Sequence, residues 1–287
     1  GQAIFEGMKA FRNAEGDILL FRPLENLARL NRSAERMCMP EVPEELFMES
    51  LKELLRLDAD WIPTGEGQSL YVRPFMIATE EFLGVKPSSS YKFMIICSPV
   101  GNYYSQPVKV KIESEYSRAT EGGVGYAKTA GNYGSSLYPA RLAQATGYDQ
   151  LIWTDSHRHE FIEEAGTMNV AFVIDNTLIT PTVSSTILAG ITRDSALQLA
   201  RHWDIPVEER RISVHEVIAA LENGTMQEAF GVGTAATIAP LSLIGWNGQD
   251  YHLPPAETFT VANRLKNALE GMKRGTTEDP FGWVTRL

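Results

Sequence analysis

The segment Gly125-Tyr-Ala-Lys128-Thr-Ala-Gly131-Asn-Tyr133-Gly-Ser-Ser136 is the most informative part of this chain. It is too rich in glycine for regular structure and too apolar for an ordinary solvated loop. We therefore expect Lys128 to be partly desolvated, which would lower the pKa of its amine because desolvation disfavours the ammonium form. Such an amine attacks carbonyl groups and forms a Schiff base. The alternative is an ordinary loop charge, the commoner role of a lysine beside glycines.

A second segment, Phe161-Ile-Glu163-Glu164-Ala-Gly166-Thr167-Met-Asn169, places two acids between apolar runs that are typical of strands. An acid there needs a partner, because an unpaired buried charge is costly. Two further segments could present backbone N–H groups to an anion, Ala189-Gly190-Ile191-Thr192-Arg193-Asp194 and Phe230-Gly231-Val-Gly233-Thr234-Ala235-Ala236. Each alone has a structural explanation, a helix entry for the first and a bulge or close strand packing for the second.

These features together predict a cofactor. Pyridoxal 5′-phosphate requires a reactive lysine, a carboxylate that keeps its ring nitrogen protonated, and N–H-rich turns for its phosphate. A competing interpretation is a nicotinamide-dependent oxidoreductase, because Gly231–Ala236 matches the glycine pattern of a dinucleotide fingerprint. That fingerprint needs a helix opening at the glycines, and Pro240 interrupts the run. His157-Arg-His159-Glu160 lies in a polar turn and is weak evidence for a metal, so we expect no metal site.

Length and composition indicate a globular protein of two domains. The chain has 287 residues, which is near the length where single cores stop growing, and 44% of them are hydrophobic. A net charge of −10, spread along the chain, argues against nucleic acid as a partner. No apolar run is long enough to span a bilayer and no signal-peptide pattern is present, so we expect a cytoplasmic protein. Cys38 and Cys97 are far apart and predict two buried free thiols.

The first hundred residues predict an α+β domain, residues 1–100. Residues 1–22 are expected to form a hairpin, and we expect a preceding segment to be missing because residues 1–11 resemble a strand already in progress. A helix should start at Pro23, with Leu24, Leu27 and Leu30 on its apolar face and Arg29 on another face. Further elements are expected as a helix over 44–57 and strands over 69–79 and 91–97. Residues 101–107 have the proline, glycine and asparagine of an interdomain connector.

The larger second domain, residues 108–287, contains all four chemical segments. Strands are predicted over 108–113, 150–155, 168–175 and 226–232, and helices over 136–145, 192–203, 213–222 and 262–273. Ser213 with Glu216 fits a capping box. We therefore expect an α+β and α/β protein of two domains.

Seven segments resemble, in order, the branched-chain amino-acid aminotransferases, which are pyridoxal-phosphate enzymes of fold type IV. The matching segments are Ile4-Phe-Glu-Gly-Met-Lys9, Glu25-Asn-Leu-Ala-Arg29-Leu, Tyr71-Val-Arg73-Pro74, Lys128-Thr-Ala-Gly-Asn-Tyr133, Glu164-Ala-Gly-Thr-Met-Asn169, Gly190-Ile-Thr-Arg193-Asp194 and Gly233-Thr-Ala235. The resemblance covers nearly the whole chain. It implies a small N-terminal α+β domain and a larger C-terminal domain, with the cofactor between them.

The resemblance also implies roles for single residues. Lys128 would be the Schiff-base lysine, and Glu164 the acid on the pyridine nitrogen, since it stands five positions before Asn169 as the family motif requires. Tyr133 would hydrogen-bond the phenolate oxygen of the cofactor. The phosphate would be held by Arg29, Ile191, Thr192 and Thr234, and the other implied cofactor positions are Leu188, Gly190 and Gly233.

Substrate positions follow from the same resemblance. Tyr71 and Arg73 would form a substrate-side pair, and strand alternation puts them on one face. The other implied positions are Phe5, Tyr103, Thr167, Ala235 and Ala236. Leu83 and Val85 match a loop that reaches the neighbouring subunit's site in the family, which implies a homodimer. Two departures are that a tyrosine of the family's pocket would lie before Gly1, and that Ala236 and Ala239 replace a Cys-x-x-Cys pair of some members.

The function implied is transamination of leucine, isoleucine and valine with 2-oxoglutarate, giving branched 2-oxo acids and glutamate by ping-pong kinetics. Within the fold, the alternatives are a D-amino-acid aminotransferase and an aminodeoxychorismate lyase. From other classes, the alternatives are the nicotinamide oxidoreductase and a catalytically silent binding module.

Overall fold

The computed structural model describes all residues from Gly1 to Leu287, and the chain divides into two units. The first unit comprises Gly1–Tyr103, Ala127–Gly131 and Ala268–Leu287, and the second comprises Tyr104–Tyr126 and Asn132–Asn267. The structure thus counts the last twenty residues and the segment around Lys128 with the first unit. The domain boundaries at residues 100 and 107 stay a prediction.

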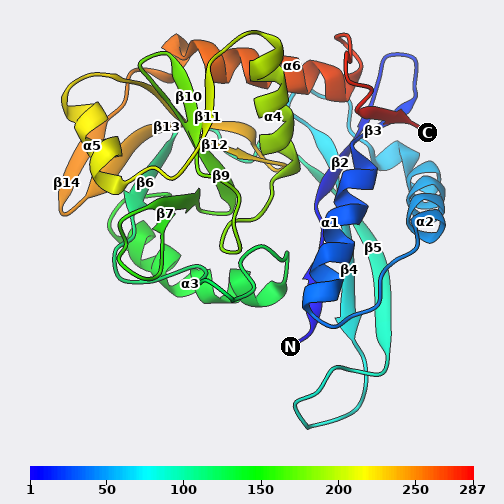
Figure 1. Ribbon diagram of the computed structural model, residues 1–287. Helices are drawn as coiled ribbons and strands as arrows, with labels where there is room; N and C mark the ends of the chain where they lie inside the picture. The colour runs from blue at the N-terminus through cyan, green and yellow to red at the C-terminus, as the bar shows by residue number, and fades with distance from the viewer. The chain divides into compact units, whose positions relative to one another are not determined.

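An antiparallel sheet forms the centre of the first unit (Figure 1). Its strands are β1 (Ala3–Phe5), β2 (Met8–Arg12), β3 (Ile18–Phe21), β4 (Ser69–Ala78), β5 (Tyr91–Val100) and β15 (Val284–Arg286). β1 and β2 pair one after the other with β4, so the residues between them, Glu6 and Gly7, lie beside the middle of β4. The predicted hairpin is formed by β2 and β3, with the turn over residues 13–17.

Two helices cover this sheet. α1 (Pro23–Arg36) and α2 (Glu44–Leu57) have the predicted starts, and their buried leucines and Phe47 share one core with β2, β3 and β4. A 3₁₀ turn, η1 (Ala59–Trp61), follows α2. The predicted apolar face of α1 is wrong at two positions, since Leu24 is 48% exposed whereas Arg29 is buried. Cys38, just after α1, is exposed, so the prediction of a buried thiol there is also wrong.

Nine strands form the sheet of the second unit. They are β6 (Val108–Ile112), β7 (Gln150–Thr154), β8 (Ile162–Ala165), β9 (Met168–Ile174), β10 (Thr177–Thr180), β11 (Val207–Glu209), β12 (Met226–Gly233), β13 (Thr237–Trp246) and β14 (Gln249–His252). The order runs β11-β10-β9-β12-β13-β6-β7-β8, and β8 also pairs with β9, so six of the strands close into a ring. Such closure leaves those strands without a free edge.

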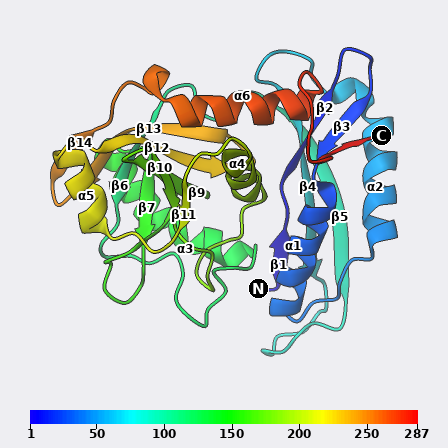
Figure 2. The ribbon, with the colours of Figure 1, turned by 45° about the horizontal axis from the view of Figure 1, so that its top comes forward.

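Helices complete the second unit, and one of them corrects a prediction. They are α3 (Ala130–Ala145), α4 (Ile191–His202) and α5 (Val214–Glu222), with the 3₁₀ turn η2 (Ala256–Thr258) before α6 (Thr260–Arg274), whose residues from Ala268 on belong to the first unit. The contacts place α4 beside β11 and β12 and α5 beside β14, as Figure 2 shows. α3 begins at Ala130 rather than at Ser136, so Gly131 and Gly134 are helical despite their poor helix propensity. Ser213 caps α5 as predicted, its Oγ accepting from Glu216 N.

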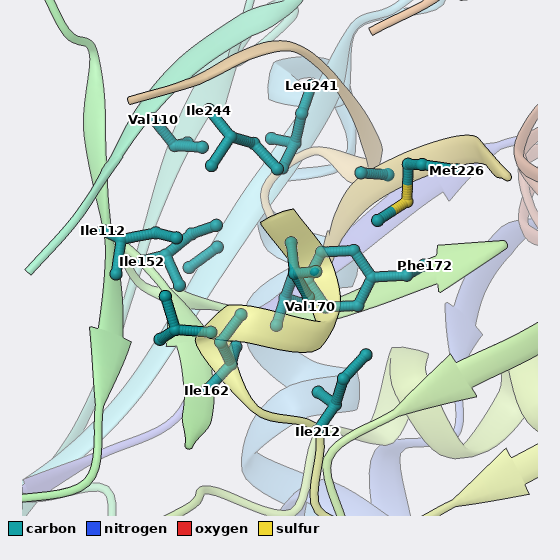
Figure 3. Close-up of a cluster of buried hydrophobic side chains, with 14 of the residues drawn as sticks. Val110, Ile112, Ile152, Ile162, Val170, Phe172, Ile212, Met226, Leu241 and Ile244 are labelled. Atoms are coloured by element: carbon teal, nitrogen blue, oxygen red, sulfur yellow. The ribbon is translucent and has the colours of Figure 1, made fainter. Parts of the chain in front are cut away.

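Aliphatic side chains from the ring of strands form the core of the second unit (Figure 3). Val110, Ile152 and Phe172 lie in it and are fully buried. Burial of this kind stabilises the folded state by about 25 cal/mol per Å² of apolar surface. The packed core holds the strands in place and thereby positions their ends. No helix of the chain combines the length and the apolar character that crossing a membrane requires.

Candidate functional site

Lys128 is anchored by its backbone to β1 and α1. Its N–H donates to Ser33 Oγ at 2.9 Å, and its carbonyl accepts from Phe5 N at 3.0 Å. The side chain is half-buried, and Nζ lies 5.0 Å from the centroid of the Phe5 ring. The half-burial of Lys128 agrees with the expectation that this lysine is partly desolvated. Turns and bends precede Lys128, Thr129 forms an isolated bridge with Ile4, and α3 begins at Ala130.

Arg29 and Glu6 form a buried ion pair next to this lysine. Arg29 Nε donates to Glu6 Oε1 at 2.7 Å and its Nη2 donates to Oε2 at 2.9 Å, so the contact is bidentate. Asn26 Nδ2 and Gly7 N also donate to Oε2. Burial by itself would raise the pKa of Glu6. The charges of Arg29 and Lys128 and the hydrogen bonds from Arg29 and Asn26 have the larger, opposite effect, so the pKa lies below its usual value. A buried negative charge thus faces both Arg29 and Lys128.

Phe5, Tyr71 and Arg73 gather beside the same lysine. The guanidinium carbon of Arg73 lies 4.5 Å from the Phe5 centroid and 5.1 Å from that of Tyr71, and Nη2 donates to Tyr71 Oη at 2.8 Å. No protein group accepts from the buried Nε of Arg73. The structure therefore brings three of the four predicted substrate residues of the first unit together beside Lys128, and Tyr103 is the exception.

In the second unit, Glu164 is a buried carboxylate held by several partners. It is 4% exposed, and its Oε2 lies 3.0 Å from Arg118 Nε. Its Oε1 accepts from Leu188 N at 2.8 Å and from Asn169 Nδ2 at 3.4 Å. Arg118 Nη2 in turn donates to the carbonyls of Thr186 and Gly125. These donors stabilise the ionised form of Glu164 and fix its orientation.

The turn from Leu188 to Thr192 leads into α4 and is tied to the same carboxylate. Asn169 Nδ2 donates to the Leu188 carbonyl at 2.9 Å, and Gly190 is the N-terminal cap of α4. A Cβ at Gly190 would collide with Asn169 Oδ1, so this position requires glycine. Ile191 and Thr192 are the first helical residues, where backbone N–H groups and the helix dipole favour an anion.

Gly233–Ala236 form the turn between β12 and β13. Because an antiparallel strand follows instead of a helix, the dinucleotide fingerprint is wrong. Gly231 has a structural role, since a Cβ there would meet the side chain of Met168. Gly233, Thr234, Ala235 and Ala236 are all half-buried.

The remaining predicted positions lie in varied surroundings. Tyr133 is half-buried in α3, Thr167 is exposed in the β8–β9 turn, and Tyr103 is 53% exposed. Leu83 and Val85 are fully exposed in the loop between β4 and β5. His159 Nδ1 lies 2.8 Å from Thr154 Oγ1, and this hydrogen bond gives one of the two histidines of the polar turn a structural role.

Reasoning from sequence missed two charged partners. Glu6 stands in the quoted Phe5-Glu6-Gly7 run, where an acid between apolar strand residues was a usable signal. Arg118 lies in a polar loop and offered no such signal, because only the fold brings it to Glu164.

Comparison with known proteins agrees with this geometry. The family described as amino-transferase class IV matches residues 3–244, and the chain belongs to this family. Branched-chain-amino-acid aminotransferase 2 of Bacillus subtilis (strain 168) is 47% identical, covering 100% of this chain and 80% of the relative. The branched-chain-amino-acid aminotransferase of Mycolicibacterium smegmatis is 44% identical, covering 100% and 80%.

Solved structures show the same likeness. A branched-chain aminotransferase from Thermoproteus uzoniensis, described with norvaline, has a TM-score of 0.84 and 27% identity, covering 99% of this chain and 89% of that one. A branched-chain amino acid aminotransferase of T.th., in complex with N-(5'-phosphopyridoxyl)-L-glutamate, has a TM-score of 0.81 and 27% identity, with the same coverages. The predicted family and the fold type IV architecture are confirmed.

Proposed function

We infer that the chain is a pyridoxal-phosphate-dependent branched-chain-amino-acid transaminase. The observation that carries this inference is 47% identity, over the whole of this chain, to a relative of that name. The donor chemistry is consistent with it, because a half-buried lysine amine and a carboxylate fixed by an arginine are what the cofactor needs from a protein.

Each unit contains residues whose chemistry fits one part of the cofactor. We propose that Lys128 binds its aldehyde, that Glu164 contacts its ring nitrogen and that Tyr133 contacts its phenolate oxygen. Support for Glu164 is its ionised, immobilised carboxylate, which Arg118 and Leu188 hold. The proposed phosphate ligands are Arg29, Ile191, Thr192 and Thr234, with Leu188, Gly190 and Gly233 shaping the turns. Glu6 would orient the Arg29 guanidinium for this task.

The bound cofactor supplies a carbonyl for the amino group and a ring that accepts electrons. Lys128 Nζ then acts as the base that removes the proton from the substrate Cα, since it is the amine nearest the proposed substrate residues. Glu6 stabilises the ammonium form that Nζ acquires, because its carboxylate is buried and its charge acts on Lys128. Glu164, whose carboxylate pairs with Arg118, would keep the ring nitrogen protonated when the cofactor is bound.

We propose L-leucine, L-isoleucine and L-valine as amino donors and 2-oxoglutarate as the acceptor. Phe5 offers an apolar ring for an aliphatic side chain, and Arg73, which lies close to the rings of Phe5 and Tyr71, offers a guanidinium for a second carboxylate. A solved relative bound to a phosphopyridoxyl-glutamate supports glutamate as one partner of the exchange. Tyr103, Thr167, Ala235 and Ala236 complete the proposed substrate positions.

A homodimer is the proposed assembly. Its support is the loop of Leu83 and Val85, whose apolar side chains are fully exposed in the single chain. Cytoplasmic localisation stays a prediction.

A chiral assay tests the substrate class. The purified enzyme with pyridoxal phosphate and 2-oxoglutarate should convert L-leucine, L-isoleucine and L-valine to their 2-oxo acids and form L-glutamate. D-leucine and D-alanine should give no product above the enzyme-free control. Turnover of the D-amino acids alone would favour the D-amino-acid aminotransferase of the same fold instead.

A further inference from the structure

A cavity lies in the second unit, lined by Glu163 but not by Glu164. Its volume is about 710 Å³, within the range of small-molecule sites. Residues from four segments line it, Thr120–Glu121, 155–163, 181–187 and Arg211. None of the proposed cofactor or substrate residues lines this cavity.

Glu163 is the unusual member of this lining. The pairing of β7 with β8 shifts register here, so Trp153 pairs with Glu164 and Thr154 with Ile162, which leaves Glu163 as the extra residue. Such bulges redirect a side chain out of the regular alternation. Its carboxylate is buried, since only 7% of the residue is exposed. Thr186 Oγ1 donates to Oε1 at 2.5 Å, whereas no protein group donates to Oε2.

The other acids of the lining are differently placed. Asp155 accepts three backbone N–H groups of its own turn, from Arg158, Glu160 and Phe161. Glu121 and Glu160 are not buried. Four acids against two arginines give the lining a negative balance, which favours a cationic group. Burial raises the pKa of Glu163, and the hydrogen bond from Thr186 and the charges of Arg118 and Arg211 offset this effect only in part.

We propose that this cavity binds a small organic ammonium whose N–H donates to Glu163 Oε2. A protonated amine meets both needs of the site, because it supplies the absent donor and the opposite charge. Two sources share this chemistry, a simple amine and the ammonium end of an amino acid. For an amino acid, the carboxylate would meet Arg211, whose guanidinium lies 3.6 Å over the Phe161 ring and forms no ion pair within the chain.

The site is connected to the acid proposed for the cofactor. Thr186 donates to Glu163 through its side chain, and its carbonyl accepts from Arg118, which pairs with Glu164. An occupant could therefore change how Glu164 is held. Any effect of the occupant on turnover rests on the proposed function, whereas its binding to Glu163 does not.

Titration calorimetry of the holoenzyme with trimethylammonium and with N,N-dimethylglycine tests the proposal. A tertiary ammonium keeps one N–H donor but cannot condense with an aldehyde, so the result is independent of the cofactor chemistry. Wild type should bind trimethylammonium saturably at one site. Glu163→Gln should weaken binding by at least about tenfold, as expected for a lost hydrogen bond to a charged group. Glu160→Gln, an equivalent change in the same lining, should alter it less than about twofold.

Arg211→Gln separates the two sources. If N,N-dimethylglycine loses affinity in this variant while trimethylammonium does not, the occupant is an amino acid, and if both keep their affinity it is a simple amine. Absence of saturable binding, or equal binding by wild type and Glu163→Gln, overturns the proposal.

A crystal structure of the wild-type holoenzyme with N,N-dimethylglycine is independent of any variant's stability. Its nitrogen within hydrogen-bond distance of Glu163 Oε2 supports the site. Water alone at Oε2 overturns it.

Discussion

Arg118 fixes the position of Glu164, and its own position is fixed by two backbone carbonyls. Its Nε faces Glu164 Oε2 at 3.0 Å, while Nη2 donates to the carbonyls of Gly125 and Thr186. Arg118→Gln removes the positive charge and the guanidinium group that contacts Glu164 and the two carbonyls. We expect kcat for L-leucine to fall roughly 10- to 100-fold, because the buried Glu164 carboxylate loses its ion-pair partner and such a loss costs about 1–3 kcal/mol. Arg141→Gln, on an exposed part of α3, is the control and should leave kcat unchanged. Equal kcat in wild type and Arg118→Gln would contradict this role.

Glu6 makes a prediction for stability and its dependence on pH. Glu6→Gln leaves the Arg29 guanidinium buried without a countercharge, so the free energy of unfolding at pH 7 should fall by about 3–5 kcal/mol. The pKa of Glu6 is lowered in the folded protein, so its contribution is present above the ordinary glutamate pKa and is lost as the pH falls through the lowered value. The difference between wild type and variant, measured by urea denaturation, should therefore shrink in acid.

Glu25→Gln is the matched control for this measurement. Glu25, an exposed residue in the first turn of α1, lies 3.8 Å from the N-cap residue Arg22, and loss of this long contact should cost less than about 1 kcal/mol. A difference for Glu6→Gln that stays constant down to acid pH would be evidence against the ion pair as its cause.

Arg73 makes a prediction for substrate choice. Arg73→Ala removes the guanidinium proposed to receive the second carboxylate of 2-oxoglutarate, and leucine has no such group. Single-turnover rates of the two half-reactions should therefore separate, with the 2-oxoglutarate half losing more. Phe5→Leu keeps an apolar side chain at the stacked position and should spare that preference. Equal losses in both halves would refute the assignment of Arg73.

Single residues could be predicted where local sequence determined their role. Lys128 was recognisable because its neighbours exclude a solvated loop, and its half-burial agrees with that inference. Arg29 was assigned to an exposed helix face by periodicity, yet Glu6, 23 positions earlier, draws it into the interior. Helical spacing cannot reveal such a pair, because its energy comes from tertiary contact.

At the scale of elements, Glu228 links β12 to the start of α6. Its buried carboxylate accepts from the N–H groups of Thr260, Val261 and Ala262 at 2.6–2.8 Å. These are the backbone donors that a helix start leaves without an intrahelical acceptor.

Glu228→Gln should lower the free energy of unfolding by about 1–3 kcal/mol, because the amide nitrogen cannot replace the lost acceptor. Glu257→Gln, exposed in η2, is the control for urea denaturation. The role of Glu228 would be wrong if both variants unfolded at the same urea concentration.

Long elements with a clear period were predicted to within a few residues, as α2 shows by matching residues 44–57. The strands β10, β11, β13, β14 and β15 were missed, because several are short and Pro240 in β13 argued against a strand. α3 starts six residues earlier than predicted since tertiary packing overrides the low propensity of its glycines.

At the scale of the whole molecule, the exposed loop between β4 and β5 predicts assembly. Leu83→Asp with Val85→Asp places two charges where apolar side chains are fully exposed, and burying these charges in a dimer would be costly. Wild type should sediment as a dimer and the double variant should dissociate. Leu57→Asp, at a 77% exposed position of α2, should remain dimeric. A monomeric wild type would contradict the proposed assembly.

The most direct measurement is the visible absorption spectrum of the purified protein before and after borohydride, with peptide mapping of the reduced adduct. The proposed function predicts a yellow protein that L-leucine bleaches and a reduced cofactor attached to Lys128. A protein that stays colourless with added pyridoxal phosphate, or an adduct on a lysine other than Lys128, would contradict it.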